Sequence, residues 1–431
     1  MPIRLDDHSP DFTARFAAFL SMKREVARDI DMAARAIVED VAARGDDALI
    51  EATAKFDRLS LKPETLRVSA GDIAAATAAC DPKTVDALKL ARDRIEVYHR
   101  RQLPKDERFT DPLGVELGWR WSAVEAVGLY VPGGTAAYPS SVLMNAVPAK
   151  VAGVSRIVMV VPAPDGKLNP LVLAAASLAG ITEVYRVGGA QAVAALAYGT
   201  ATIKPVAKIV GPGNAYVAAA KRIVFGKVGI DMIAGPSEVL VMADRTANPD
   251  WIAADLLAQA EHDVNAQSIL LTDDEELAGH VERAVEAQLA TLPRAAIARP
   301  SWNDFGAIIV VKSMEAALPL ADAIAAEHLE IMTADAEALA ARVRNAGAIF
   351  IGAYTPEAIG DYVGGSNHVL PTARSARFSS GLNVLDFMKR TSILKCGAEQ
   401  LRALGPAAMT LGTAEGLDAH ARSVGVRLNL P

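Results

Sequence analysis

A short helical segment, DLLAQAEHD at residues 255–263, ends with polar side chains that could bind a metal ion. Asp255, Gln259 and His262 follow one another at four- and three-residue spacing, which places them on one face of a helix. An amide oxygen and an imidazole nitrogen are suitable zinc ligands. A Gln/His pair near a helix end is also common as solvated surface, so the spacing alone leaves both interpretations open.

A second candidate group lies at the start of an apolar strand, in AEHLEIM at residues 326–332. Glu327 and His328 enter a buried environment there, where a carboxylate and an imidazole are costly unless they are paired or used in catalysis. A satisfied polar corner would explain the same two residues. Two later segments also combine an acidic residue with a histidine, namely Asp361 with His368 and Glu415 with His420.

The composition predicts a soluble globular protein of the reducing cytoplasm. Of the 431 residues, 51% are hydrophobic and 22% are charged, and the net charge of −7 argues against a nucleic-acid binder, which needs clustered Lys and Arg. Cys80 and Cys396 form no CxxC pair, so neither a disulfide framework nor a thiolate metal site is indicated. The acidic N-terminus does not resemble a signal peptide, and the apolar runs are too short to cross a bilayer. We therefore expect no membrane or nucleic-acid partner.

The elements that position these candidates alternate between helix and strand. Residues 23–57 place apolar side chains at helical spacing, with Gly45 as a break. From Val127 onward, short Val/Ile-rich runs alternate with helical stretches in two successive series, which is typical of buried parallel strands. The expected fold class is α/β, with two Rossmann-like parallel-sheet domains, a helical N-terminal region and a small helical C-terminal domain.

Composition shifts suggest where the domains begin and end. We expect an N-terminal helical arm over residues 1–27 and a small C-terminal domain over residues 384–431. One α/β domain, with the metal and catalytic candidates, is expected to combine residues 28–134 and 239–383, and the other to span residues 135–238. The C-terminal unit has too little core to stand alone, so it must dock either on its own chain or on a partner subunit.

Glycine-rich loops follow several predicted strands, which is where open α/β sheets bind ligands. Such glycines let the backbone approach an anionic group, with helix N-termini available behind them, but they also serve plain tight turns. The chain lacks the GxGxxG fingerprint, so motif spacing does not by itself indicate a dinucleotide. The glycines concerned are Gly133, Gly134, Gly188, Gly189, Gly211 and Gly213.

Several longer segments together resemble one known family. They are GLYVPGGTAAYPSSVLMNAVPAKVAGV, KIVGPGNAYVAAAKR, IDMIAGPSEVLVMAD, DLLAQAEHD, AEHLEIM and DYVGGSNHVLPT, and they resemble L-histidinol dehydrogenase in family order from about Ile30 to the C-terminus. The resemblance implies a zinc-dependent oxidation of L-histidinol to L-histidine by two molecules of NAD, through a tightly held histidinaldehyde. It also implies an intertwined homodimer whose C-terminal units complete the neighbouring active sites.

The resemblance also assigns roles to individual residues. The catalytic pair falls on Glu327 and His328, and NAD contacts fall on Tyr130, Gln191 and Asn214 in and around the 135–238 domain. Zinc ligands fall on Gln259, His262, Asp361 and His420. Substrate contacts fall on Ser237, Gln259, His262, His328, Asp361, His368, Glu415 and His420.

The chemistry of these residue types is consistent with such an oxidation. We expect His328 to accept the hydroxyl proton in each oxidation and Glu327 to activate water for attack on the aldehyde. A metal-dependent hydrolase could use the same ligands and the same glutamate, but it would release no NADH. A non-enzymatic nucleotide-binding protein on this scaffold would need neither residue.

Overall fold

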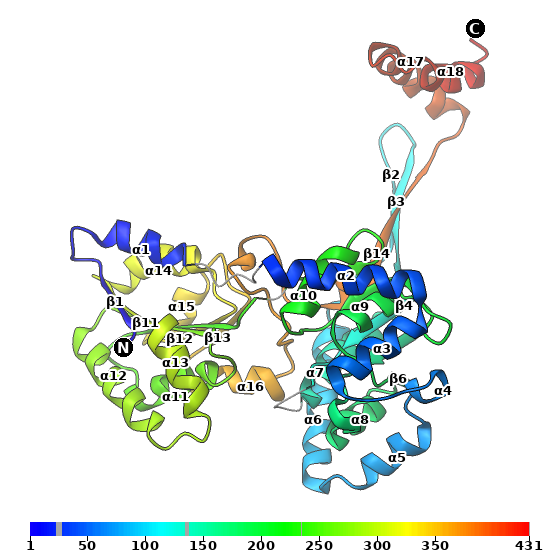
Figure 1. Cartoon of the computed structure of the whole chain (residues 1–431). Helices are drawn as coiled ribbons and strands as arrows, with labels where there is room; N and C mark the ends of the chain where they lie inside the picture. Colours follow the sequence, from blue (N-terminus) through cyan, green and yellow to red (C-terminus); the bar gives the residue numbers. More distant parts are fainter. Residues whose placement is uncertain (23–27, 134–137, 234, 431) are drawn as a thin grey trace.

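The computed structural model describes residues 1–22, 28–133, 138–233 and 235–430 of the chain. Figure 1 shows two α/β units side by side and a small helical unit that stands apart from both, at the end of an arm of strands. The described residues form two parallel sheets and one antiparallel sheet. No helix within the described ranges is long and apolar enough to span a membrane.

One parallel sheet has five strands in the order β6-β5-β4-β7-β8. Its central strand β4 is buried at every position, as expected for a strand covered by helices on both faces. In chain order this arrangement is 3-2-1-4-5, so the strand order reverses between β4 and β7. The strands are β4 (Ala126–Tyr130), β5 (Arg156–Val160), β6 (Glu183–Tyr185), β7 (Lys208–Val210) and β8 (Gly229–Ile230).

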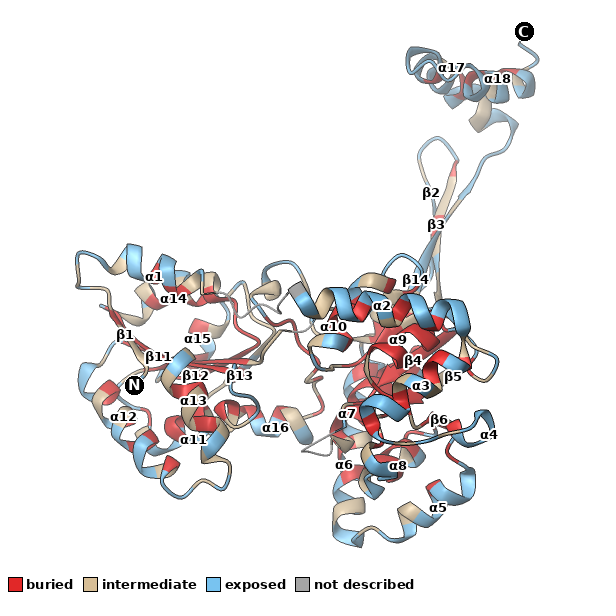
Figure 2. Ribbon diagram, in the orientation of Figure 1, coloured by how far each residue is buried: buried red, intermediate tan, exposed pale blue. Residues whose placement is uncertain are grey.

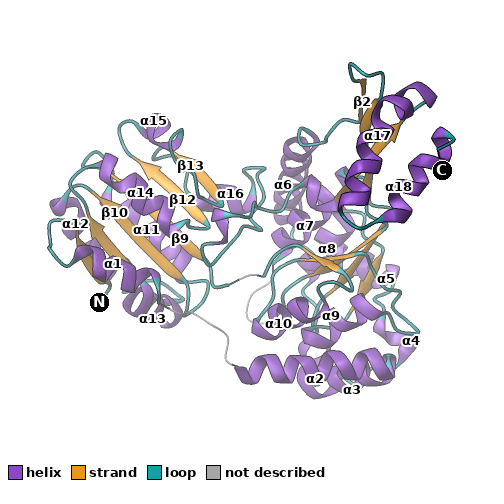
Figure 3. Cartoon of the chain, turned by 90° about the horizontal axis from the view of Figure 1, so that it is seen from above, coloured by secondary structure: helices purple, strands orange, loops and turns teal. Residues whose placement is uncertain are grey.

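Helices cover both faces of this sheet (Figure 3). The N-terminal helices belong to the same unit, because α2 packs on α9 and α10, while α6 packs on α7 and α8. The helices of the unit are α2 (Arg28–Arg44), α3 (Asp46–Asp57), α4 (Pro63–Leu66), α5 (Ala70–Ala78), α6 (Pro82–Arg100), α7 (Pro139–Val151), η1 (Pro164–Gly166), α8 (Pro170–Leu178), α9 (Gly189–Tyr198) and α10 (Ala215–Val224).

The other parallel sheet has six strands in the order β1-β11-β10-β9-β12-β13. Without the N-terminal strand β1, its order is again 3-2-1-4-5, which confirms the prediction of two units of related architecture. The strands are β1 (Ile3–Asp6), β9 (Glu238–Ala243), β10 (Gln267–Thr272), β11 (Ala307–Val310), β12 (His328–Met332) and β13 (Ala348–Ile351).

The helix that carries Gln259 begins where the sequence indicates. Asn248 caps it through its side chain, which accepts the backbone N–H of Asp250 at 2.8 Å, and Pro249 occupies the first turn. The helices of this unit are α1 (Phe12–Leu20), α11 (Pro249–Ala260), α12 (Glu275–Leu289), α13 (Ala295–Phe305), α14 (Met314–Ile324), α15 (Ala336–Ala340) and α16 (Glu357–Tyr362).

The third sheet is an arm of three antiparallel strands in the order β14-β3-β2. β2 and β14 are mostly exposed and β3 is mostly half-buried, whereas the inner strands of the parallel sheets, such as β4, β9 and β10, are buried at every position (Figure 2). Beyond β14 the chain forms a two-helix C-terminal unit. The elements are β2 (Glu107–Thr110), β3 (Glu116–Ala123), η2 (Ser375–Arg377), η3 (Val384–Phe387), β14 (Met388–Lys395), α17 (Ala398–Ala414), α18 (Asp418–Gly425) and η4 (Val426–Leu428).

The expected domain boundaries need correction. Residues 28–134 do not join residues 239–383, because β4 is the central strand of the five-stranded sheet and its apolar side chains fill that unit's cores. Residues 1–27 are not a purely helical arm, since β1 extends the six-stranded sheet by pairing with β11. The boundary near residue 383 is also wrong, because Val369, Leu382, Val384 and Phe387 pack in the core of the five-stranded unit.

Candidate active site

Glu327 and His328 lie where β12 begins, next to β9 in the middle of the six-stranded sheet. Both are buried, with 5% and 4% of their surface exposed. The His328 Nδ1 atom lies 3.2 Å from the backbone carbonyl oxygen of Glu238, and a Glu327 carboxylate oxygen accepts the backbone N–H of Glu238 at 3.1 Å. A carbonyl oxygen can only accept, so in a neutral ring Nδ1 carries the hydrogen and Nε2 is free to take a proton.

Three carboxylates surround the His328 ring. Its Nε2 atom is 3.5 Å from Asp361, and its Nδ1 atom is 3.7 Å from Glu357 and 3.9 Å from Glu327. Burial lowers the pKa of His328, but these carboxylates outweigh it and raise that pKa well above its ordinary value. Burial raises the pKa of Glu327 to about 7. Glu327 therefore titrates near neutral pH, which suits a general base.

Further carboxyl groups line the back of this site. A Glu330 carboxylate oxygen accepts the backbone N–H of Glu357 at 2.6 Å. Burial raises the pKa of Glu357 to about 8 and that of Asp255 to about 6. Burial and the neighbouring acids Asp255 and Glu357 raise the pKa of Glu330 well above its ordinary value. Carboxyl groups packed at this density share protons rather than all carrying charge.

A possible metal site adjoins His328. Ligand atoms of His262, Glu357 and Asp361 all lie within 4.8 Å of one another. Gln259, one helical turn before His262, is fully buried, and neither its amide oxygen nor its amide nitrogen has a hydrogen-bond partner within the described part of the chain. An unpaired buried amide costs free energy, so a further partner is expected for it. These nitrogen and oxygen donors fit a zinc ion.

Two predicted substrate residues, His368 and Ser237, lie near the start of β12. The His368 Nδ1 atom is 2.9 Å from the backbone oxygen of Asp361, and its Nε2 atom is 3.3 Å from the hydroxyl of Ser141 in α7. His368 therefore connects the two α/β units. Ser237 is partly buried and directly precedes β9, level with the start of β12.

The three residues predicted to contact NAD lie at the carboxyl ends of the five-stranded sheet. Tyr130 ends β4, and its hydroxyl oxygen accepts the backbone N–H of Gly189 at 3.0 Å. Burial raises its pKa to about 12. Gln191 is buried in the first turn of α9, whereas Asn214 is exposed and caps α10 by accepting two backbone N–H groups. The Tyr130 side chain therefore supports the turn before α9 from inside the core.

The structure does not bring two predicted residues to this site. Glu415 and His420 are exposed and lie in the C-terminal unit, which Figure 1 shows far from both α/β units. Within one chain, the site therefore contains three of the four predicted zinc ligands and lacks His420.

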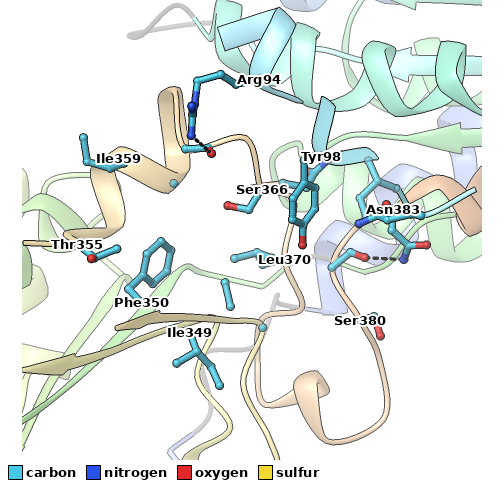
Figure 4. A pocket seen from close by; sticks show the side chains of 18 of the residues that line it. Arg94, Tyr98, Ile349, Phe350, Thr355, Ile359, Ser366, Leu370, Ser380 and Asn383 are labelled. Atoms are coloured by element: carbon cyan, nitrogen blue, oxygen red, sulfur yellow. Dashed lines mark hydrogen bonds between the residues drawn. The ribbon is translucent and has the colours of Figure 1, made fainter. Parts of the chain in front are cut away.

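A cavity of about 720 Å³ lies beside the predicted site (Figure 4). Arg94 on its wall is already occupied, since its guanidinium donates to the backbone oxygens of Val363 and Gly364. Phe350 also lines the cavity, and its ring centroid is 5.9 Å from that of His328. The cavity thus lies next to His328. No carboxylate or histidine is among the described residues that line it, and the predicted proton transfers require such groups.

Glu357 and Glu330 also belong to the buried carboxyl group cluster beside His328, but they are not among the residues predicted from the sequence. Glu357 precedes Asp361 by four residues in α16, and this helical spacing could have placed the two on one face. Glu330 follows His328 by two residues along β12, so both side chains point to the same face of the sheet. The sequence signal for Glu330 was a carboxylate within an otherwise apolar strand, because a buried carboxylate is rare unless it is paired.

Comparison with known proteins identifies the family of the chain. A family model described as histidinol dehydrogenase matches residues 20–428. The chain belongs to the histidinol dehydrogenase family. It is 80% identical over 430 residues to a histidinol dehydrogenase of Bradyrhizobium diazoefficiens and 71% identical over 430 residues to one of Brucella abortus, each alignment covering 100% of both chains. A solved histidinol dehydrogenase of Elizabethkingia anophelis has 37% identity and a TM-score of 0.94, covering 99% of this chain and 98% of that one.

Proposed function

We propose that the protein oxidises L-histidinol to L-histidine with two molecules of NAD and one zinc ion per site, as the last step of histidine biosynthesis. The observation that carries this proposal is the buried Gln259 amide, which has no hydrogen-bond partner among the described residues and lies one helical turn before His262. His262 lies in a cluster with Asp361, and Asp361 is 3.5 Å from Nε2 of His328. The family membership supports the same reaction.

Zinc would be held by Gln259, His262 and Asp361 of one chain together with His420. It would supply a positive charge and a fixed orientation for the imidazole and amino nitrogens of the substrate. A cation beside Asp361 would also oppose the carboxylates that raise the pKa of His328. The imidazole would then be neutral and able to act as a base at neutral pH.

Within the chain, His328 removes and returns protons at the substrate oxygen. The Nδ1 atom lies 3.2 Å from the backbone oxygen of Glu238, so Nε2, which lies 3.5 Å from Asp361 on the metal side, is the ring nitrogen that can accept a proton. In the first oxidation Nε2 accepts the hydroxyl proton, and in the second it accepts a proton from the hydrated aldehyde. Glu327 takes a proton from water so that the water can add to the aldehyde between these steps. NAD supplies the hydride acceptor for both oxidations.

The carboxyl ends of the five-stranded sheet would hold NAD. Asn214 uses its side-chain oxygen to cap α10, which leaves its amide nitrogen available as a donor. Gln191 and the backbone amides of the glycine-rich turns add further donors for a charged ligand. These features support binding of a dinucleotide at a sheet edge that contains no GxGxxG fingerprint.

A direct assay tests the reaction. Purified protein is incubated with histidinol and NAD, with and without a chelator, while NADH absorbance and histidine are measured. We expect two NADH per histidine, loss of turnover with the chelator and its return with zinc. Hydrolysis without NADH would indicate a metal-dependent hydrolase, and NAD binding without turnover would indicate a nucleotide-binding protein.

We further propose a cytoplasmic homodimer in which each C-terminal unit completes the neighbouring site. The unit exposes several large apolar side chains, which supports docking on another surface. Among its exposed residues are Leu404, Leu411, Leu417, Val426 and Leu430.

Subunit exchange tests this arrangement. Asp361→Ala and His420→Ala variants, each inactive alone, are mixed and allowed to form heterodimers. If sites are shared, each heterodimer has one doubly damaged and one intact site, so activity returns to about half per heterodimer when sites are independent. If each chain completes its own site, demonstrated heterodimers stay inactive.

A further inference from the structure

Lys221 and Asp231 form an ion pair in the interior of the five-stranded unit. Their side chains are only 3% and 1% exposed. Lys221 lies in α10, and Asp231 directly follows β8. Burying two charges contributes little net stability compared with apolar residues of similar size, so a buried pair is weak evidence for a role in stability.

Both partners of the pair also bind the backbone of Gly211. The Lys221 ammonium donates to the Gly211 carbonyl oxygen at 3.0 Å, and the Asp231 Oδ2 atom accepts the Gly211 N–H at 2.7 Å. The other carboxylate oxygen accepts the N–H of Met232 at 2.6 Å. Each polar group of the Gly211 backbone is therefore bound to a full charge, which gives stronger hydrogen bonds than neutral partners do.

Gly211 is held in a conformation that other residues rarely adopt. Its φ angle is +109°, and a Cβ atom at this position would lie 2.2 Å from the backbone oxygen of Tyr130. The chain after β7 therefore passes directly against the end of β4, at the point where the strand order reverses.

This contact joins the segments that carry all three residues predicted to contact NAD. Gly211 touches Tyr130, whose hydroxyl accepts the Gly189 N–H at the start of the helix that carries Gln191. Asn214 follows Gly211 by three residues. A shift of Gly211 would therefore move the loop of Asn214 relative to the other two segments.

We propose that Lys221 and Asp231 are positioning residues for the cofactor: they hold Gly211 so that residues 211–214 are arranged for NAD before it binds. This inference rests on the proposed function, because it takes the carboxyl ends of the five-stranded sheet as the NAD site. Preorganisation of this kind favours binding by removing the cost of ordering the loop. The hydrogen bonds of the pair within the described residues go to Gly211 and Met232 and to none of the predicted metal or histidinol residues, so its effect should be confined to NAD.

The opposite end of the same strand offers a matched control. Lys208, the first residue of β7, pairs with Asp386 at 3.0 Å and also donates to its backbone oxygen at 2.7 Å. The side chains of this pair are 14% and 25% exposed. It has the same chemistry as the first pair but lies at the amino end of the strand, away from the proposed NAD site.

The test compares two double variants, Lys221→Met with Asp231→Asn and Lys208→Met with Asp386→Asn. Neither leaves an unpaired charge, and both asparagines keep an acceptor. Calorimetry measures the Kd for NAD, and steady-state kinetics measures KM for NAD and for histidinol. We expect the first variant to raise the Kd and KM for NAD by about tenfold, with the histidinol KM and zinc content within twofold of wild type. The control variant should stay within twofold for every quantity.

Equal NAD affinity in wild type and the Lys221/Asp231 variant, or equal weakening in both variants, would overturn the inference. If the double variant does not fold, the isosteric Asp231→Asn variant is compared with Asp386→Asn, since each removes the carboxylate charge of its pair and leaves the lysine in place. Failure of the wild-type protein to bind NAD would instead refute the proposed function, so the two failures are distinguishable.

Discussion

Apart from the added strand β1, the two parallel sheets share one strand order, but their predicted functional residues lie at opposite ends of the strands. In the five-stranded sheet, the predicted NAD residues follow the carboxyl ends of β4 and β7 and the turn after β6. In the six-stranded sheet, Glu327 and His328 stand where β12 begins, and Ser237 stands before β9. The reversal of strand order lies between the first and fourth strands in both sheets. The point where the strand order reverses is therefore a favourable location for a binding site. The local side chains decide whether the amino or the carboxyl ends of the strands form that site.

The carboxyl end of the six-stranded sheet shows why that edge does not resemble a dinucleotide site. Asp244 follows β9, and its carboxylate accepts the N–H of Ala334 beyond β12 at 2.8 Å and the N–H of Thr246 at 2.9 Å. The carboxylate thus joins the two strands at the switch point and places a negative charge there. In the five-stranded sheet, Gly211 directly follows β7, and its backbone packs against the end of β4.

The largest expected effect concerns the amino-end edge of the six-stranded sheet. His328→Asn should lower oxidation of histidinol and reduction of histidinaldehyde alike, by about 10²- to 10⁴-fold, because proton transfer at the substrate oxygen occurs in both directions. Glu327→Gln should impair the oxidation to histidine far more than the aldehyde reduction, since only the former needs activated water. Equal losses in both assays for Glu327→Gln would refute this division of roles.

A smaller effect, of opposite sign in two states, is expected at Gln259. Gln259→Leu removes a buried amide that has no hydrogen-bond partner among the described residues. The free energy of unfolding of the metal-free variant should therefore exceed that of metal-free wild type by about 1–3 kcal/mol. With zinc the order should reverse, because the variant loses a ligand. The Kd for NAD should not change. The same order in both states would exclude Gln259 as a ligand.

On the carboxyl-end edge, Tyr130→Phe should weaken NAD binding by about fivefold, because it removes the acceptor of the Gly189 N–H. Zinc content should stay at the wild-type level. The matched control is Tyr185→Phe in the same sheet, whose hydroxyl donates to Glu183 and Thr202 instead. An equal loss of NAD affinity in the control would show a general effect on the sheet.

A further expected effect is a change in the pH dependence of stability. The pKa of Asp255 is raised by burial from 3.8 to about 6, so the folded state binds its proton more tightly than the unfolded state. This contribution is present at low pH and is lost as the pH rises from about 4 to 6. Asp255→Asn should remove this slope, worth roughly 3 kcal/mol for a shift of about two pKa units. Denaturant titrations from pH 4 to 7 measure it, and an unchanged slope would contradict the raised pKa.

The strands could be predicted from the sequence because they leave local signals, whereas most candidate site residues were assigned through the family resemblance and stay predictions. The apolar runs of β9 and β12 and the cap at Asn248 are encoded within a few residues. The domain boundaries failed because β4 and Val384 belong to units defined by contacts between distant segments. The sequence did place Glu327 and His328 at the start of a strand, but it did not indicate that Ser237, before β9, lies level with them, because that depends on how the strands pair.

The remaining carboxyl groups escaped prediction for a related reason. Glu357 and Glu330 acquire their properties only when α16 and β12 pack together and exclude water. Asp255 did lie on the predicted helix face, but its interaction with Glu330 becomes evident only in three dimensions. Local spacing identifies which residues share a face, and packing determines their charge.

The proposed function requires the amino end of the six-stranded sheet and the carboxyl end of the five-stranded sheet to act at one site. The nicotinamide of NAD would then face the metal. Replacing zinc by Mn²⁺, with binding verified by electron paramagnetic resonance, allows proton relaxation of bound NAD to be measured by NMR. Hydride transfer requires contact distances of about 3–3.5 Å between reacting atoms, so the nicotinamide protons should relax much faster than the adenine protons. Asp361→Ala should abolish the enhancement. Bound NAD with no enhancement, or with the adenine relaxed more strongly, would contradict a single site built from both edges.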